Sequence, residues 1–165
     1  MNRPKPIPPK AGQESVWDYP RPPRLEPVSK SIEVWFAGVL IARTTKAFRV
    51  LETTHPPVYY IPPEDIAMEF LRPVEKRTGC EWKGLGSYYD VVVGDQMAAE
   101  AAWYYAQPTK AFEAIKNYPA FYAHKMDRCL VDGIDVEPQP GNFYGGWITP
   151  DIVGPFKGIE GSWGW

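Results

Sequence analysis

The chain has 165 residues, which suits one domain and lets folding bury roughly 70% of the surface that the unfolded chain exposes. Hydrophobic residues make up 44% and charged residues 23%, a balance that excludes wholesale disorder in spite of 19 prolines. The formal net charge of -2 disfavours the broad electropositive surface of non-specific nucleic-acid binding, so no nucleic-acid partner is expected.

Cysteine content and the N-terminal sequence bear on the compartment. Two cysteines, Cys80 and Cys129, are too few for the disulfide framework of a small secreted protein. The first ten residues are basic and proline-rich and contain no apolar run of signal-peptide length. No stretch elsewhere is long and apolar enough to span a bilayer. We therefore expect a cytoplasmic protein with no membrane partner.

Prolines dominate residues 1–27. They remove backbone donors and favour extended, polyproline-like chain over helix or central strand. The same segment carries Val16, Trp17 and Tyr19, whose side chains need an apolar surface to pack against. Residues 1–27 are therefore expected to form an N-terminal arm whose middle lies across the domain or a neighbouring subunit.

Alternating apolar and polar residues predict antiparallel strands in the middle of the chain. Residues 32–36 and 39–41 flank a possible turn at Ala37-Gly38, which is typical of a β-hairpin. The other expected strands share β-branched or aromatic residues bounded by turn residues, and they are 48–52, 58–61, 87–93, 101–105, 120–124, 130–131 and 135–136.

Two short helices are predicted between these strands. Pro62-Pro63-Glu64-Asp65 places prolines and carboxylates at a helix start, and Pro73 would end that helix. The second short helix is predicted over residues 109–116. The expected fold is therefore mainly β with short helices, in the α+β class.

The C-terminal segment, residues 138–165, combines glycines and prolines with large apolar side chains such as Phe143, Tyr144 and Trp147. Burying one such side chain is worth about 1.5–3 kcal/mol, so the tail should not stay in water. We expect it to pack on the domain, residues 28–137, or on a partner subunit. A homodimer held by the arm and the tail is the favoured arrangement.

Familiar catalytic and metal-binding spacings do not occur in the sequence. Residues 81–88 contain glycines and a lysine but lack the spacing of a P-loop or a dinucleotide fingerprint. Gly86-Ser87 is not followed by the Asp-x-Asp pair that two-metal nucleotidyl transfer requires. No metal site is expected, because no short Cys-x-x-Cys or His-x-x-x-His spacing joins Cys80, Cys129, His55 and His124.

Aromatic and polar side chains on or beside the predicted strands form the candidate site. Aromatic walls with a few polar groups are what a small-molecule pocket needs. Lys83 could give the Cys80 thiol some thiolate character if both face one cavity. The alternatives are an ordinary aromatic core and an inert, buried Cys80. The expected ligand-binding residues are Glu52, Tyr60, Cys80, Lys83, Tyr88, Trp103 and Tyr105, and Tyr59 and Tyr122 belong to the same group. Catalytic residues and a cofactor are left open.

Four segments carry a resemblance to a known family. Thr78-x-Cys80-x-x-Lys83-Gly84-x-Gly86-Ser87-Tyr88 is preceded by Tyr59-Tyr60-x-Pro62 and Asp65, and followed by Trp103-x-Tyr105-x-x-Pro108 and Ala120-Phe121-Tyr122. In these residues the chain resembles the domain-of-unknown-function four-twenty-seven family. The resemblance covers about residues 30–137, and the arm and tail look like the additions of a longer bacterial subgroup.

The resemblance implies a β-tent-like fold, in which two antiparallel sheets meet at an angle. The family carries a nucleotidyltransferase-type label but no established reaction, and a fold-level label does not establish function. Zinc-bearing relatives of that fold pin their sheets with two cysteine pairs, whereas this sequence has only Cys80 and Cys129, which puts a structural zinc in doubt. Gly86 stands where the family usually has alanine.

Three functions stay open at this point. The first is a protein or enzyme that binds a small molecule in an aromatic pocket between sheets. The second is a nucleotidyltransferase, as the family label suggests, although the motifs give it no support. The third is a non-catalytic structural or interaction protein whose aromatic residues are simply core. Convergence of the candidate residues on one pocket would favour the first.

Overall fold

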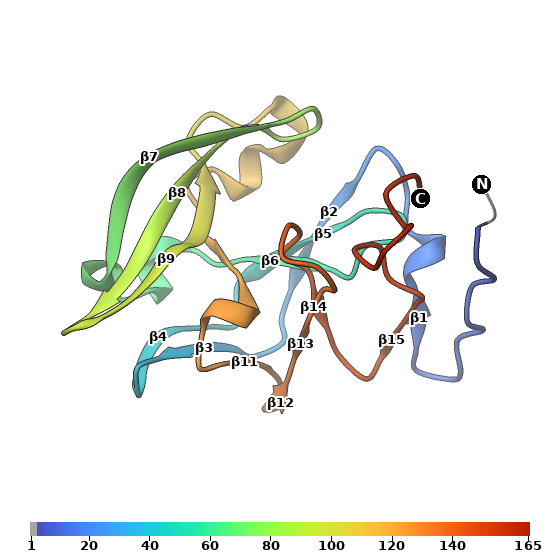
Figure 1. Cartoon of the computed structure of the whole chain (residues 1–165), viewed down its shortest axis with the longest axis horizontal. Coiled ribbons are helices and arrows are strands. Elements are labelled where there is room, and N and C mark those ends of the chain that lie inside the picture. Colours follow the sequence, from blue (N-terminus) through green and yellow to red (C-terminus); the bar gives the residue numbers. More distant parts are fainter. Residues whose placement is uncertain (1–2) are drawn as a thin grey trace.

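The computed structural model describes residues 3–165, and Met1 and Asn2 of the predicted arm lie outside the described residues. Three antiparallel sheets and two short strand pairs make up the chain, with short 3-10 helices between strands (Figure 1). The sheets do not close into a barrel within the described range. This confirms the mainly β class with antiparallel sheets packed at an angle, although the strands divide into more than two sheets.

The sheet that carries most of the candidate site is a long antiparallel meander. It contains β7 (Leu71–Cys80), β8 (Gly84–Val93) and β9 (Gln96–Tyr105), and β10 (Ala120–Phe121) adds to the edge of β9. The sequence predicts most of β8, the second half of β9 and all of β10, but it misses β7. Among the residues of β7 only Leu71 is buried, so no alternating hydrophobic pattern marks it.

The predicted helix after Pro62 is wrong. The chain instead makes two single turns, η2 (Pro63–Asp65) and η3 (Met68–Phe70), separated by extended backbone. Pairing with the neighbouring strand β4 (Val39–Thr44) overrides the helical signal, because the Ala67 amide donates to the Ile41 carbonyl at 2.8 Å. Pro73 then lies inside β7, which tolerates proline because it is the edge strand of its sheet.

A second four-stranded sheet contains the predicted hairpin, β3 (Ile32–Phe36) and β4 (Val39–Thr44). Ala37 and Gly38 at its turn have φ values of 50° and 74°, the left-handed pair that suits the twist of a two-residue hairpin. The expected strands 130–131 and 135–136 are also confirmed as a ribbon, because β11 (Arg128–Val131) pairs with β3 and with β12 (Ile134–Asp135). The expected strand 120–124 does not join this ribbon: β10 pairs with β9, and residues 123–125 form a 3-10 turn.

The third sheet joins β2 (Arg24–Val28), β5 (Ala47–Leu51) and β6 (Val58–Tyr60). The last residues of the predicted arm therefore form an edge strand, where Pro27 is tolerated. The second predicted helix appears as η4 (Lys110–Ile115), two 3-10 turns that meet at a kink at Phe112.

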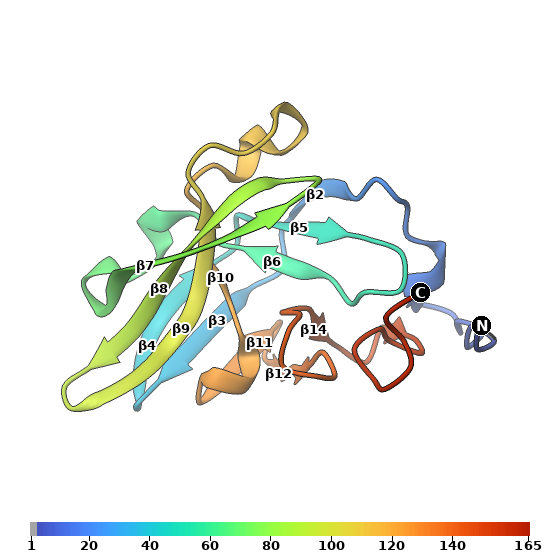
Figure 2. The ribbon, with the colours of Figure 1, turned by 45° about the horizontal axis from the view of Figure 1, so that its top comes forward.

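Two hydrophobic cores lie between these layers. One fills the space between the meander and the β3–β4–β11 layer, which cross at an angle (Figures 1 and 2). The other lies between the meander and β5–β6 and is unusually aromatic, because it contains Tyr60, Tyr88, Trp103, Tyr105 and Phe112. The candidate site opens from this second core.

The arm and the tail pack together on their own chain. The arm forms β1 (Glu14–Ser15) and η1 (Val16–Asp18). The domain ends with η5 (Ala123–Lys125), β11 and β12, and β13 (Glu137–Pro138) spans the boundary to the tail. The tail then forms β14 (Trp147–Ile148) and β15 (Ile152–Val153). β1 pairs with β15 in parallel. In Figure 1 the described part of the arm and the C-terminus lie at the same side of the molecule. The homodimer stays a prediction.

No helix within residues 3–165 is long and apolar enough to cross a membrane.

Candidate functional site

All seven predicted ligand-binding residues line one cavity of about 470 Å³. Small-molecule pockets commonly measure about 300–1,000 Å³. The residues reach the cavity from separate parts of the chain: Glu52 follows β5, Tyr60 lies on β6, Cys80 ends β7, Lys83 lies in the next turn, Tyr88 lies on β8, and Trp103 and Tyr105 lie on β9. The fold thus brings together every residue of the predicted set.

Strand alternation explains why the β8 and β9 residues converge. Tyr88 lies directly opposite Trp103 in the antiparallel pair, and Tyr105 is two residues further along β9 on the same face. The intervening Tyr104 points to the other face, where its ring stacks on that of Tyr89 with centroids 4.7 Å apart. One face of the meander therefore supplies an aromatic wall.

Tyr60 lies at the bottom of the cavity and contacts that wall. Its side chain is 1% exposed, and its ring meets those of Trp103 and Tyr105 with centroids 6.4 Å and 6.3 Å away. Burial raises the pKa of the phenols of Tyr60, Tyr105 and Tyr122. These phenols therefore keep their protons at neutral pH and can act as hydrogen-bond donors.

The two other aromatic residues of the predicted group, Tyr59 and Tyr122, lie in different places. Tyr122 lines the same cavity, and its ring lies 4.5 Å from that of Trp103. Tyr59 instead points to the opposite face of β6, because adjacent residues of a strand face opposite sides, and it lines a different cavity.

The tail supplies a wall that sequence reasoning missed. Residues 142–145 line the cavity, and the Tyr122 hydroxyl donates to the Phe143 carbonyl at 3.3 Å. Gly145 packs so closely on the Trp103 ring that a Cβ at this position would lie 2.2 Å from Trp103 Cη2. Its aromatic content predicts that the tail docks, but no sequence signal indicates the surface on which it docks.

His55 also lines the cavity, although it is not among the ligand-binding residues expected from the sequence. It lies between Glu52 and the tail. Gln139 is buried, and its Nε2 donates to His55 Nδ1 at 3.0 Å and to the Lys157 carbonyl at 2.9 Å. This assigns the remaining ring proton to Nε2, which lies 3.5 Å from a Glu52 carboxylate oxygen. Arg21 pairs with the same carboxylate at 3.1 Å.

Burial, with smaller contributions from Lys157, Arg21 and Lys83, lowers the pKa of His55 to about 3. The neutral ring is therefore a fixed part of the cavity at physiological pH. Tyr144 of the tail meets it edge to face, with ring centroids 4.7 Å apart.

Cys80 and Lys83 line the cavity together, as the nucleophile hypothesis requires. Cys80 is a half-buried free thiol, whereas Cys129 is a free thiol in the core and only 2% exposed. The Lys83 Nζ lies 5.9 Å from the centroid of the Tyr105 ring. Residues 3–165 contain no group of three or more His, Cys, Asp or Glu side chains that could hold a metal ion.

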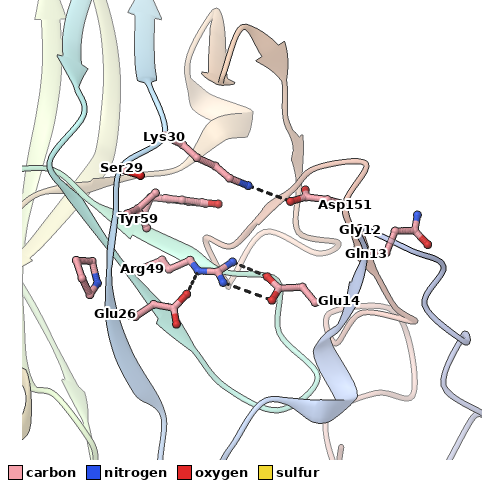
Figure 3. A pocket seen from close by; sticks show the side chains of 11 residues that line it. Gly12, Gln13, Glu14, Glu26, Ser29, Lys30, Arg49, Tyr59 and Asp151 are labelled. Carbon is pink, nitrogen blue, oxygen red and sulfur yellow. Dashed lines mark hydrogen bonds and ion pairs between the residues drawn. The ribbon is translucent and has the colours of Figure 1, made fainter.

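A second cavity, of about 370 Å³, lies between the arm, the third sheet and the tail (Figure 3). Arg49 at its centre pairs with Glu14 of the arm at 2.6 Å and with Glu26 of β2 at 2.5 Å. On the opposite side Lys30 pairs with Asp151 of the tail at 3.0 Å. The charged side chains of this cavity pair with one another, and these ion pairs hold the arm and the tail in place like a clamp.

Comparison with known proteins identifies the domain but not its reaction. No curated protein matches the chain. A family model with a nucleotidyltransferase-type name, described as a domain of unknown function (DUF427), matches residues 24–132. The match runs from β2 to β11 and includes all seven predicted site residues, whereas the tail wall and Lys157 lie outside it. Because the match covers more than half of the 165 residues, the chain belongs to the DUF427 family.

Proposed function

We propose that this protein binds a small molecule in the aromatic cavity between the meander, β6 and the tail. One observation carries the proposal: residues singled out from the sequence as a pocket set line a single cavity of about 470 Å³. The wall of that cavity offers aromatic faces for stacking, and its edge offers phenol, thiol and ammonium groups for orientation.

Nucleotidyl transfer receives less support from the arrangement of carboxylates. Two carboxylates, Glu52 and Glu81, line the cavity, and Glu52 is already paired with Arg21. Two-metal phosphoryl transfer requires several carboxylates that share the metal ions. The family label alone therefore does not make this the leading candidate. Whether the protein is an enzyme stays open, and the cytoplasmic location expected from the sequence stays a prediction.

A thermal-shift screen of planar organic compounds, with one arm of nucleotides plus magnesium, tests the proposal. A ligand present at about 100 times its Kd stabilises the folded state by about 2.7 kcal/mol, which raises Tm by about 5–10 °C for a chain of this size. A shift in the nucleotide arm that depends on magnesium would favour the family label. An absence of shifts in both arms would favour the structural or interaction protein.

A blocking variant assigns any shift to this cavity. Thr78 lines the cavity from β7 and lies on the same face of the meander as Tyr88, whose hydroxyl is 2.9 Å from the Thr78 Oγ1, so Thr78→Trp can fill the mouth without breaking the strand. The matched control is Thr45→Trp at an exposed turn. We expect the shift to be lost in Thr78→Trp and kept in Thr45→Trp, and a shift that survives both changes would place the ligand elsewhere.

A further inference from the structure

We propose that the ligand of this cavity is a planar anion, a ring system whose carboxylate or phosphate lies beside Lys83 and Lys157. The inference rests on the proposed binding function and adds the chemical class of the ligand. The aromatic wall alone does not determine the charge of the ligand, but the distribution of charged side chains around the cavity does.

The cavity contains cations that the protein does not neutralise. Three lysines and two glutamates line it. Lys76 is paired with Glu100 at 3.2 Å, and Glu52 is paired with Arg21 at 3.1 Å. Lys83 and Lys157 form no ion pair with any Asp or Glu side chain among residues 3–165, although the Lys157 Nζ donates to a backbone oxygen of Trp165 at 3.4 Å. After these pairs are set aside, the cavity lining holds two ammonium groups and a single carboxylate side chain, that of the exposed Glu81.

The two ammonium groups also lie beside aromatic rings of the cavity. The Lys83 Nζ lies 5.9 Å from the centroid of the Tyr105 ring, and the Lys157 Nζ lies 5.7 Å from that of Tyr144. Tyr105 belongs to the meander and Tyr144 to the tail, so cations flank the space from both walls. A planar ring that stacks in this space therefore brings its substituent within reach of an ammonium group.

His55 responds to the same positive potential. After burial, the causes that keep its imidazole neutral are the charges of Lys157, Arg21 and Lys83. A cationic ligand would meet this potential unfavourably. A neutral ligand would leave the half-buried Lys83 ammonium without a counter-ion and that of Lys157 with only the Trp165 oxygen, whereas an anion would supply a counter-ion to both.

Calorimetric titration of the full chain with matched probes tests this inference. The probes are 2-naphthoate with its neutral amide, 2-naphthamide, and adenosine monophosphate with adenosine. We expect the better anion to bind about tenfold more tightly than its neutral partner, the effect of one charge-assisted hydrogen bond. The anion that binds more tightly assigns the charged group as carboxylate or phosphate. Raising the ionic strength should weaken binding of the anion and leave that of the neutral probe unchanged.

Single charge removals connect the preference to the named lysines. Lys83→Met and Lys157→Met should each weaken binding of the anion by about fivefold to tenfold and change that of the neutral probe by less than about twofold. Lys46→Met, at an exposed turn away from the cavity, is the matched control and should change neither.

The outcomes separate this inference from the proposed function. Equal affinities for each anion and its neutral partner, or lysine variants that bind anions normally, would overturn the anion preference while leaving the cavity a binding site. If none of the four probes binds, the planar-anion inference falls, whereas the proposed binding function is decided by the thermal-shift screen.

Discussion

At the scale of single residues, His55 links the cavity to the stability of the fold. It is 8% exposed, and its contacts with Gln139 and Tyr144 join the domain to the tail. The pKa of His55 is about 3 in the folded chain and 6.5 in the unfolded chain. At a pH between these two values, the unfolded chain therefore binds a proton on His55 that the folded chain does not bind. Above pH 6.5 the residue is neutral in both states and carries no penalty.

Stability should therefore fall as the pH drops below 6.5, by up to about 1.4 kcal/mol per pH unit from this residue. His55→Asn removes the titration and keeps an acceptor for Gln139, so its free energy of unfolding should depend less steeply on pH. Urea unfolding at about pH 7.5 and about pH 5 measures the difference. His124→Asn, at an exposed position, should retain most of the parent slope. Equal slopes for the parent and His55→Asn would contradict the assignment.

The two cysteines should differ in reactivity because one lines the cavity and the other lies in the core. Cys80 is half-buried, whereas burial raises the pKa of the Cys129 thiol and its side chain is 2% exposed. Iodoacetamide should therefore modify one thiol in the native chain and both in urea, as intact mass reports. Cys80→Ala should remove the native reaction. Native modification of Cys129 would show that the core opens more readily than its packing indicates.

At the scale of elements, hydrophobic alternation decides what the sequence could predict. The β3–β4 hairpin and the β11–β12 ribbon combine alternation with a Gly-containing turn, and both are confirmed. β7 was missed, because its exposed edge position leaves no pattern to detect. The site set could be predicted from aromatic residues on strands. The tail wall could not, since its placement depends on a close contact between Gly145 and Trp103 that has no periodic signature.

That contact makes Gly145→Ala a test of how the tail docks. The new methyl carbon would overlap Trp103, so the tail must shift away from the meander. We expect a loss of about 1–3 kcal/mol in stability and faster hydrogen exchange at Trp147, whose amide donates to the Pro57 carbonyl. Gly79→Ala is the matched control, because a Cβ there meets nothing within 4 Å. Unchanged exchange at Trp147 would show that the tail is held elsewhere.

At the scale of the whole molecule, the segments outside the family match complete the structure. The Trp17 Nε1 donates to the Pro155 carbonyl at 2.9 Å, and the Trp17 and Trp165 rings lie 5.5 Å apart. Val16 and Ile152 pack on Leu51 in a small core of their own. The arm and the tail therefore hold each other against the third sheet, and the tail reaches from this clamp to the wall of the aromatic cavity.

The predicted homodimer has to be reconciled with these contacts. Because the arm and the tail pack on their own chain, most of the aromatic surface expected to join two subunits is already covered. The aromatic surface left at the tail includes a patch of Phe143, Tyr144 and Trp163, in which Phe143 is 68% and Trp163 is 58% exposed. A dimer formed by the tail should therefore pack through this patch.

Light scattering of the full chain and of a Phe143→Ser, Trp163→Ser double variant tests that prediction. The parent should have the mass of a dimer and the variant that of a monomer, because removing two exposed aromatic anchors takes away the centre of the interface. Ile134→Ser, which removes a side chain 49% exposed on β12, is the matched control and should stay dimeric. A monomeric parent would reject the dimer. A double variant that remains dimeric would place the interface outside the tail. Because Phe143 also lines the aromatic cavity, such an interface would leave the mouth of the cavity open in both subunits.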